Sequence, residues 1–287
     1  MGKQTQAEKR RSDRLTIAMS LQVTGMDQSG QRFMEQVRTL SVSRDGATIV
    51  VRRELTPGQQ VIIRRPENDK TANARVVGQI GGQPHGYVYG LALPNPGTNL
   101  WDILFPPLAD ADKAVLRLLL ECTGCRAHEI VYLNELETEV FEASSSLSRA
   151  CQSCSDWTVW KQAPSEVPAE HLETQSNALP ESHPASKSRA KKGRKEVRVH
   201  FNEKACIRHP GFGEEVVHVE NVSRGGLCFH SSKAYLEGSR IEVAVPYSPG
   251  APCIFVPARI VRARELPGKG LKKYGVTYAR PSKGSST

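Results

Sequence analysis

Short runs of alternating apolar and polar residues dominate both ends of the chain. Two blocks, roughly residues 15–93 and 199–278, each contain six such runs, rich in β-branched residues and often separated by Gly, Pro or Asn. Period-two alternation bounded by turn residues predicts half-buried β-strands. Six short strands in about 90 residues are typical of a small antiparallel barrel, which leaves no sheet edge exposed. The expected strands are 15–24, 32–42, 47–54, 60–65, 74–80 and 87–93, then 199–207, 215–222, 227–230, 240–246, 254–262 and 274–278.

The two blocks repeat one another. Matching residues occur in the same order, at an offset that stays between 180 and 185. Ordered matches at a nearly constant offset indicate a duplicated domain with small loop insertions. The matches are Arg14 with Arg198, Ser43-Arg44 and Gly46 with Ser223-Arg224 and Gly226, Gly58 with Gly238, Ala74-Arg75 and Val77 with Ala258-Arg259 and Val261, and Tyr89-Gly90 with Tyr274-Gly275.

The segment between the blocks has a different pattern. Leu116, Leu119 and Leu120 recur at helical spacing, so we expect residues 100–105 and 109–121 to be partly helical. Residues 162–193 contain several prolines but no aromatic residue or isoleucine, too little apolar surface to offset the entropy of ordering. We therefore expect an all-β chain. Its parts are a barrel over 1–100, a small helical module over 101–161, a flexible linker over 162–193 and a barrel over 194–287.

The charge of the chain changes sign along its length. Its 287 residues suit two or three small domains and carry a net charge of +9. Residues 1–100 carry +6, residues 101–184 carry −9 and residues 185–287 carry +12. Basic surfaces concentrate anions such as nucleotides, nucleic acid or acidic lipids, although the same excess is also found on ordinary solvated surfaces.

Neither a membrane span nor a signal peptide is expected. No run reaches about 18 uninterrupted apolar residues, and residues 1–14 are polar and basic. We therefore expect a cytoplasmic protein, in which thiols are usually reduced.

Four of the seven cysteines form two Cys-x-x-Cys pairs, Cys122 with Cys125 and Cys151 with Cys154, separated by 25 residues. One such pair would suit redox chemistry, but two pairs can converge on a single zinc ion. Four thiolates close the coordination shell of zinc, so we expect a structural metal. The arrangement resembles a zinc ribbon.

Catalytic constellations are not evident in the sequence. The eight histidines are scattered, and no nucleophile elbow, HExxH helix or Walker A loop is present. We therefore do not expect an enzyme. Cys206, Cys228 and Cys253 lie singly in strand patterns, and we expect them to be buried apolar residues.

Two short motifs frame the first strands of the second block. A pair of arginines four residues apart precedes the first strand, and an Asn-x-Ser-x-x-Gly motif ends the second. Together they resemble the RxxxR and [D/N]xSxxG signatures of PilZ domains, the cyclic di-GMP receptor family. The resemblance covers most of residues 194–280. The residues that carry it are Arg194, Arg198, Asn221, Ser223 and Gly226.

These residue types suit a cyclic dinucleotide. Arginine pairs with phosphate oxygens or with the O6 and N7 atoms of guanine, and its planar group stacks on bases. An asparagine amide can meet a guanine edge, a serine hydroxyl can meet phosphate, and glycine permits close approach. The alternative is that the Asn, Ser and Gly only build a tight turn and that the arginines are solvated.

The first block carries a degenerate copy of the same pattern. It retains both arginines, the serine and the glycine, but a serine replaces the leading Asp or Asn. A serine cannot make a two-point contact as a carboxylate or amide can. We therefore expect either a weaker site or a purely structural barrel. The residues are Arg10, Arg14, Ser41, Ser43 and Gly46.

The resemblance implies a non-enzymatic receptor in bacterial second-messenger signalling that acts on a downstream protein partner. One alternative is a nucleic-acid-binding protein that uses the zinc ribbon and the basic segments. The negative charge of residues 101–184 argues against it, because like charges repel phosphates. A further alternative is a protein-interaction scaffold in which neither barrel binds a ligand.

Overall fold

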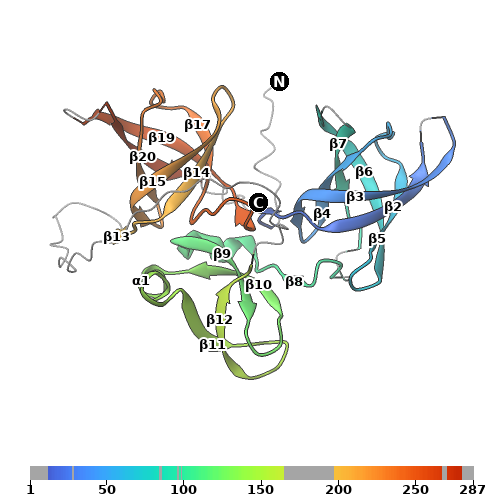
Figure 1. The fold of residues 1–287 in the computed structure, drawn as a ribbon, viewed down its shortest axis with the longest axis horizontal. Helices are drawn as coiled ribbons and strands as arrows, with labels where there is room; N and C mark the ends of the chain where they lie inside the picture. The colour runs from blue at the N-terminus through green and yellow to red at the C-terminus, as the bar shows by residue number, and fades with distance from the viewer. Residues whose placement is uncertain are drawn as a thin grey trace, which may run out of the picture.

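The computed structural model describes residues 12–27, 29–83, 86–95, 97, 99–164, 197–266 and 270–279. Figure 1 shows three bodies: the first barrel in blue and cyan, the second barrel in orange and red, and a smaller green module below them. The described residues include no helix long and apolar enough to span a membrane.

The first barrel is a closed sheet of six antiparallel strands in the order β2-β3-β4-β7-β6-β5, with β5 returning to β2. Closure pairs both edges of the sheet, and alternate side chains fill the interior. The strands are β2 (Ser20–Met26), β3 (Arg32–Ser43), β4 (Gly46–Val51), β5 (Gln60–Arg65), β6 (Lys70–Gln83) and β7 (Gly86–Ala92).

The second barrel repeats this topology in the order β14-β15-β16-β20-β19-β17, with β17 returning to β14. The expected all-β fold with two six-stranded barrels is therefore confirmed. The strands are β14 (Lys204–His209), β15 (Gly213–Ser223), β16 (Gly226–Ser231), β17 (Arg240–Ala244), β19 (Val256–Glu265) and β20 (Lys272–Tyr278).

The duplication extends to individual hydrogen bonds. The hydroxyl of Tyr89 accepts from the backbone N–H of Leu55, and that of Tyr274 accepts from the N–H of Tyr235. These pairs occupy matching positions in the two barrels. A buried tyrosine hydroxyl needs such a partner, so each barrel fixes the same loop in the same way.

Short strands link the bodies. β1 (Leu15–Thr16) pairs with β3 of its own barrel and with β18 (Cys253–Ile254), which lies between β17 and β19 of the second barrel. β13 (Val199–His200) pairs with β15. Because β1 hydrogen-bonds on both sides, β18, a segment of the chain between β17 and β19, extends the sheet of the first barrel, while the sheet of the second barrel remains separate.

The middle module is a sheet in the order β11-β12-β9-β10-β8 with one helix beside it. Helix α1 begins with a capping box between Asn134 and Glu137, a local signal that our sequence analysis missed. The elements are β8 (Ile103–Leu104), a 3₁₀ helix (Leu108–Lys113), β9 (Leu116–Cys122), β10 (His128–Leu133), α1 (Glu135–Ser144), β11 (Ser146–Ala150) and β12 (Trp157–Gln162).

The helix expected over residues 109–121 is wrong beyond the 3₁₀ turn, because the leucines lie on β9. Leu119 packs into the core of the first barrel, whereas Leu116, Leu118 and Leu120 pack with the core of the second barrel. A strand buried on both faces has no polar face to expose. Its apolar run therefore cannot be told from a helical stripe by spacing alone.

The expected linker overlaps the end of this module. Gln162 is the last residue of β12, and the buried Ala163 donates its N–H to the carbonyl of Leu119. Residues 165–193, the remainder of the expected linker apart from Pro164, lie outside the described residues.

Candidate functional site

The structure brings together two of the predicted ligand residues of the second barrel. Arg198 immediately precedes β13, and β13 pairs with β15 so that His200 lies opposite Asn221. The guanidinium Nη1 of Arg198 donates to Oδ1 of Asn221 at 3.0 Å, on the exposed side of the sheet. Arg194, the other predicted arginine, lies outside the described residues.

Ser223 and Gly226 build the turn between β15 and β16. Ser223 is buried, and its hydroxyl donates to the carbonyl of Gly226 at 3.0 Å. Gly226 has a φ of 152°, and a Cβ atom there would lie 1.8 Å from the carbonyl oxygen of Val276. Only glycine fits such a position. In this conformation Ser223 and Gly226 shape the turn, as expected if these two residues serve only to build it.

A β-bulge at Glu220 interrupts the pairing of β15 and β16, and Asn221 lies opposite Cys228 just after it. Cys228 in turn lies opposite Gly275 on β20. Directly opposed residues point to the same face of a sheet. Asn221 is therefore followed on the outer face by the small side chain of Cys228 and by the bare backbone of Gly275. We call Cys228 and Gly275 the floor.

A charged cluster borders the floor and consists of Glu220, His230 and Lys273. Lys273 hydrogen-bonds to the carboxylate of Glu220, and His230 Nε2 lies 3.2 Å from Oε2 of Glu220. Burial alone would raise the pKa of Glu220, but Lys273 and His230 outweigh it and hold that pKa below its usual value. The carboxylate therefore stays ionised and neutralises Lys273.

The first barrel repeats the turn of the second. The hydroxyl of Ser43 donates to the carbonyl of Gly46 at 3.4 Å, and a Cβ atom at Gly46 would lie 2.1 Å from the carbonyl oxygen of Leu91. Arg14 directly precedes β1, and Ser41 lies opposite Thr48. Arg10 lies outside the described residues.

The outer face of the first barrel differs in chemistry. Leu40 occupies the bulge position of β3, and Val50 and Val88 lie opposite one another on β4 and β7. By strand register, these three apolar residues replace the charged cluster of the second barrel. The first barrel therefore lacks the basic side chains that the second has in His230 and Lys273.

Apolar side chains also cover the floor of the first barrel. Gly90 corresponds to Gly275, but a Cβ atom at Gly90 would lie 3.2 Å from Cδ1 of Ile80 and 3.8 Å from Cβ of Val77. Ile80 and Val77 occupy two bulges of β6 and are 61% and 59% exposed. Val77 has a counterpart in Val261, which occupies the bulge of β19 and whose Cγ2 would lie 3.9 Å from a Cβ atom at Gly275. The floors of the two barrels therefore differ at Ile80.

The middle module contacts the candidate ligand segments of both barrels. Asp13, 9% exposed and adjacent to Arg14, accepts from Nη1 of Arg117 at 2.7 Å and from the hydroxyl of Tyr132 at 2.9 Å. Sequence separations above one hundred residues hid these contacts from sequence analysis.

The arginine that follows each motif serine also contacts the middle module. Arg44 donates to the carbonyl of Phe105, and Nε of Arg224 donates to Oε1 of Glu135 at 2.7 Å. Both motif turns are thus attached to one body.

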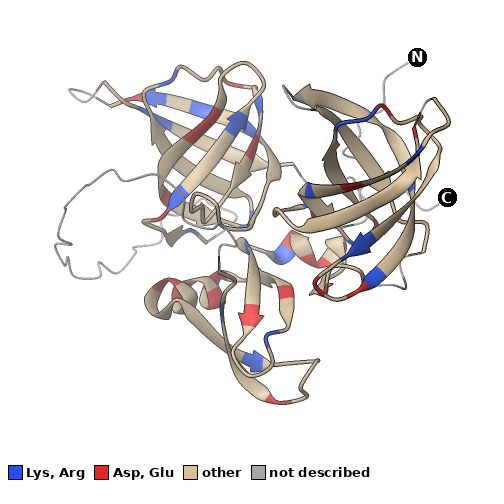
Figure 2. Cartoon of the chain, turned by 45° about the vertical axis from the view of Figure 1, so that its right-hand side comes forward, with Lys and Arg blue, Asp and Glu red and all other residues tan. Residues whose placement is uncertain are grey.

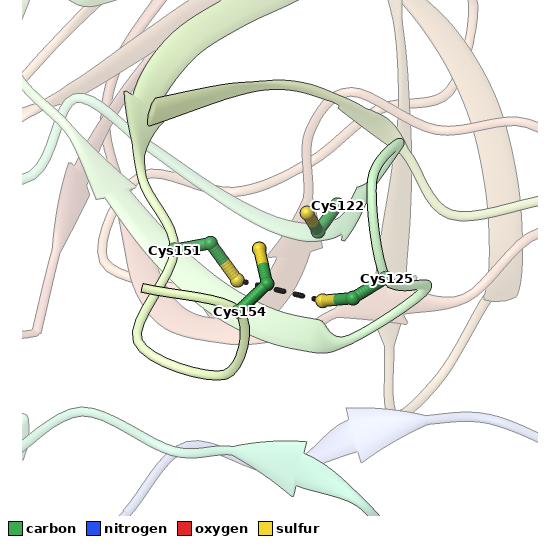
Figure 3. Close-up of side chains that lie close together, drawn as sticks. All are labelled: Cys122, Cys125, Cys151 and Cys154. Atoms are coloured by element: carbon green, nitrogen blue, oxygen red, sulfur yellow. Dashed lines mark hydrogen bonds between the residues drawn. The ribbon is translucent and has the colours of Figure 1, made fainter. Parts of the chain in front are cut away.

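Two hairpin turns of the middle module bring together the four paired cysteines. Cys122 and Cys125 lie where β9 turns into β10, and Cys151 and Cys154 lie between β11 and β12. In Figure 3 the four side chains point toward one another. Their sulfurs lie within 4.8 Å of one another, and those of Cys125 and Cys151 are 3.6 Å apart.

This geometry is compatible with a tetrahedral metal site. A zinc–sulfur bond of about 2.3 Å implies sulfur–sulfur distances of roughly 3.8 Å. A hydrogen bond from the Thr158 hydroxyl lowers the pKa of Cys122 to about 6, whereas the hydrogen bond with Cys151 raises that of Cys154 to about 12.

The three remaining cysteines lie outside this cluster. Cys206, Cys228 and Cys253 are buried, and burial raises the pKa of each thiol. The expectation that they are buried residues is confirmed.

None of the curated proteins matches this chain, but several solved structures resemble it. Among solved structures, the Bacillus subtilis inhibitor of motility MotI/DgrA shares 10% identity over 93% of this chain and 90% of its own, with a TM-score of 0.26. Escherichia coli YcgR in complex with c-di-GMP shares 10% identity over 93% and 78%, with a TM-score of 0.26. Borreliella burgdorferi PlzA in complex with c-di-GMP shares 7% identity over 92% and 81%, with a TM-score of 0.23.

With structural scores this low, the assignment rests on sequence. The family described as PilZ domain matches residues 8–103 and, separately, residues 192–286. The two matches cover both barrels and more than half of the chain. The chain therefore belongs to the PilZ domain family.

Proposed function

We propose that the chain is a non-enzymatic receptor for cyclic di-GMP and that the second barrel is its principal binding site. Family membership supports the ligand class. The observation that carries the proposal is the pairing of Arg198 with Asn221 beside the floor on the outer face of the sheet, where Cys228 is small and Gly275 has no side chain. The first barrel keeps the turn but has Ile80 against Gly90 and lacks the charged cluster.

The proposed roles follow from the chemistry of the side chains. Arg198 supplies charge-assisted hydrogen bonds to phosphate or to a guanine edge, and Arg194 supplies the second guanidinium. Asn221 offers one donor and one acceptor to a guanine. Ser223 and Gly226 hold the turn that positions Asn221. The ligand would take over the hydrogen bond that now links Arg198 to Asn221.

The proposal gives the first barrel a secondary role. Arg10, Arg14, Ser41, Ser43 and Gly46 would form at most a weaker site, because Ile80 stands over Gly90. Apolar side chains at this position exclude a flat base and supply no partner for phosphate.

We assign a structural zinc ion to Cys122, Cys125, Cys151 and Cys154. The donor set suits zinc, and the sulfur separations fit a tetrahedral site. Four thiolates leave no position for a substrate, so the ion would stabilise the two hairpin turns. The resulting zinc-ribbon-like module would keep β9 and α1 in place against the barrels.

The middle module is also the proposed route by which ligand binding reaches the rest of the chain. Arg224 is the residue after Ser223, and it contacts Glu135 at the start of α1. A ligand that moves the β15–β16 turn therefore also strains or releases this contact. The downstream partner would be a protein that reads the resulting arrangement of the barrels.

A nucleic-acid-binding function is less well supported. Figure 2 shows acidic residues on α1 and on the neighbouring strands of the middle module. Helix α1 alone carries Glu135, Glu137, Glu139 and Glu142. A duplex phosphate backbone would be repelled from this surface.

Calorimetric titration of the full chain with cyclic di-GMP, cyclic di-AMP and a short DNA duplex tests the proposed function. We expect saturable binding of cyclic di-GMP that exceeds binding of the other two. Cyclic di-AMP is the control for charge and size, because adenine lacks the guanine O6 acceptor. Absence of saturable binding, or equal affinity for all three, would contradict the proposal.

The contact between Arg224 and Glu135 makes a small contribution to the free energy of unfolding, which can be measured separately. Both side chains are partly exposed, so their coupling free energy should be about 0.2–1 kcal/mol. A double-mutant cycle with Arg224→Ala and Glu135→Ala, followed by thermal unfolding with and without cyclic di-GMP, gives this value. A coupling that is the same in both states would show that the contact does not respond to the ligand.

A further inference from the structure

On the outer face of the second barrel, Asn221, Cys228 and Gly275 lie in a row across neighbouring strands. The next residue in this row is an arginine. The pairing of β19 with β20 places Arg262 opposite Gly275. A Cβ atom at Gly275 would lie 3.5 Å from Cβ of Arg262, so both residues face the same side. The row therefore runs over four neighbouring strands from Asn221 through Cys228 and Gly275 to Arg262.

Arg262 is a cation without a partner at the open end of this row. It is exposed, and within the described part of the chain it has no hydrogen bond or ion pair. Lys273, the lysine beside the floor, is instead engaged by Glu220. A guanidinium whose charge is not already paired with a carboxylate can bind phosphate or a guanine edge without first breaking an ion pair.

The spacing of the row suits a ligand that lies across it. Neighbouring strands are about 4.8 Å apart, so the backbones of Asn221 and Arg262 are separated by roughly 14 Å. Arg198 stands beside Asn221 at one end, and Arg262 stands at the other. Gly275 has no side chain to interrupt the surface between them.

We propose that Arg262 forms the far side of the nucleotide site and closes on the ligand from the edge opposite Arg198. This inference rests on the proposed function of the second barrel. It extends the site beyond the RxxxR and Asn-x-Ser-x-x-Gly motifs to the β19–β20 hairpin.

The first barrel provides an internal comparison. Gly78 lies opposite Gly90 there, at the position of Arg262. The first barrel thus lacks the far-side cation and has Ile80 over its floor glycine, Gly90. The two barrels therefore differ in this row at both its middle and its end.

The test is titration of the full chain with cyclic di-GMP after Arg262→Ala. We expect about a tenfold or greater loss of affinity, as for loss of a charge-assisted contact. Arg262→Lys should recover only part of it, because lysine keeps the charge but not the planar fork. Arg240→Ala is the matched control, since Arg240 is an exposed arginine of β17 without a partner among the described residues. It should change affinity less than about twofold.

Gly275→Val tests the floor independently of charge. A Cβ atom at this position meets only ordinary contacts, so the barrel should fold, which circular dichroism can verify. The branched side chain should stand in the ligand's place and lower the affinity at least as much as Arg262→Ala does.

The outcomes separate this inference from the proposed function. If the wild type binds and Arg198→Ala weakens binding, but Arg262→Ala behaves like Arg240→Ala, then Arg262 is not a ligand residue and the receptor function stands. If the wild type shows no saturable binding, the receptor function fails and the role of Arg262 fails with it.

Discussion

Replacement of Arg198 by alanine is expected to weaken cyclic di-GMP binding by about 10- to 100-fold. A charge-assisted hydrogen bond contributes about 1.5–3 kcal/mol, and each 1.4 kcal/mol corresponds to a tenfold change in affinity. Arg198 already donates to Asn221 at the edge of the floor, so its guanidinium is in place before the ligand arrives. Calorimetric titration of the full chain measures the loss. Arg194→Ala should have a similar effect.

Two further variants show whether the effect is specific. Arg14→Ala removes the matching arginine of the first barrel and should leave the tightest site almost unchanged. Asn221→Ala removes a neutral partner worth about 0.5–1.5 kcal/mol and should cost less than Arg198→Ala. If the arginines are only solvated charges, Arg198→Ala and Arg14→Ala should instead give small, equal losses that disappear at high salt.

Replacement of Cys122 and Cys151 by serine is expected to abolish metal binding and to unfold the middle module. Structural zinc sites in small peptides contribute about 10–16 kcal/mol of apparent binding free energy at neutral pH, far more than the module's two short hairpins and single helix would supply alone. Elemental analysis should find about one zinc per wild-type chain and none in the variant. Limited proteolysis should then cut within residues 116–162.

Cys253→Ala is the matched control, because Cys253 is a buried cysteine outside the cluster and should leave the zinc content unchanged. Metal binding should also weaken as the pH falls. Hydrogen bonding with Cys151 raises the pKa of Cys154 to about 12 in the metal-free cluster, so zinc must displace a proton there. Protons then compete with the metal increasingly at lower pH. A folded, metal-free protein recovered from reducing, chelating buffer would contradict a structural zinc.

The two barrels share the motif turn but differ in the chemistry of the outer face. The turn built by Ser43 and Gly46 is retained, because loss of Gly46 would bring a side chain against the carbonyl of Leu91. The outer face is under no such constraint. Leu40, Val50 and Val88 can replace a charged cluster there without disturbing the core. Fold and ligand chemistry are therefore separable in this barrel.

Local physics made much of this protein predictable from its sequence. Alternation and turn residues located the twelve barrel strands, because half-buried strands show their period directly. The expected strands 15–24, 199–207 and 254–262 were too long, since each also covers residues of a separate short strand, β1, β13 or β18. Both Cys-x-x-Cys pairs could be grouped from their number and spacing, and their sulfurs converge. The motif at Asn221 was located by its resemblance to the PilZ signature, and the structure supplies the reason why its turn needs glycine at Gly226.

Tertiary structure alone decided which surfaces these elements present. The leucines of β9 lie on a strand rather than a helix because each face of the strand packs against a different core. Asp13 meets Arg117 and Tyr132 across more than one hundred residues. The row from Asn221 to Arg262 depends on strand register and on two bulges. Pairing between distant strands brings such residues together, and because no local period records that pairing, the sequence pattern alone could not reveal them.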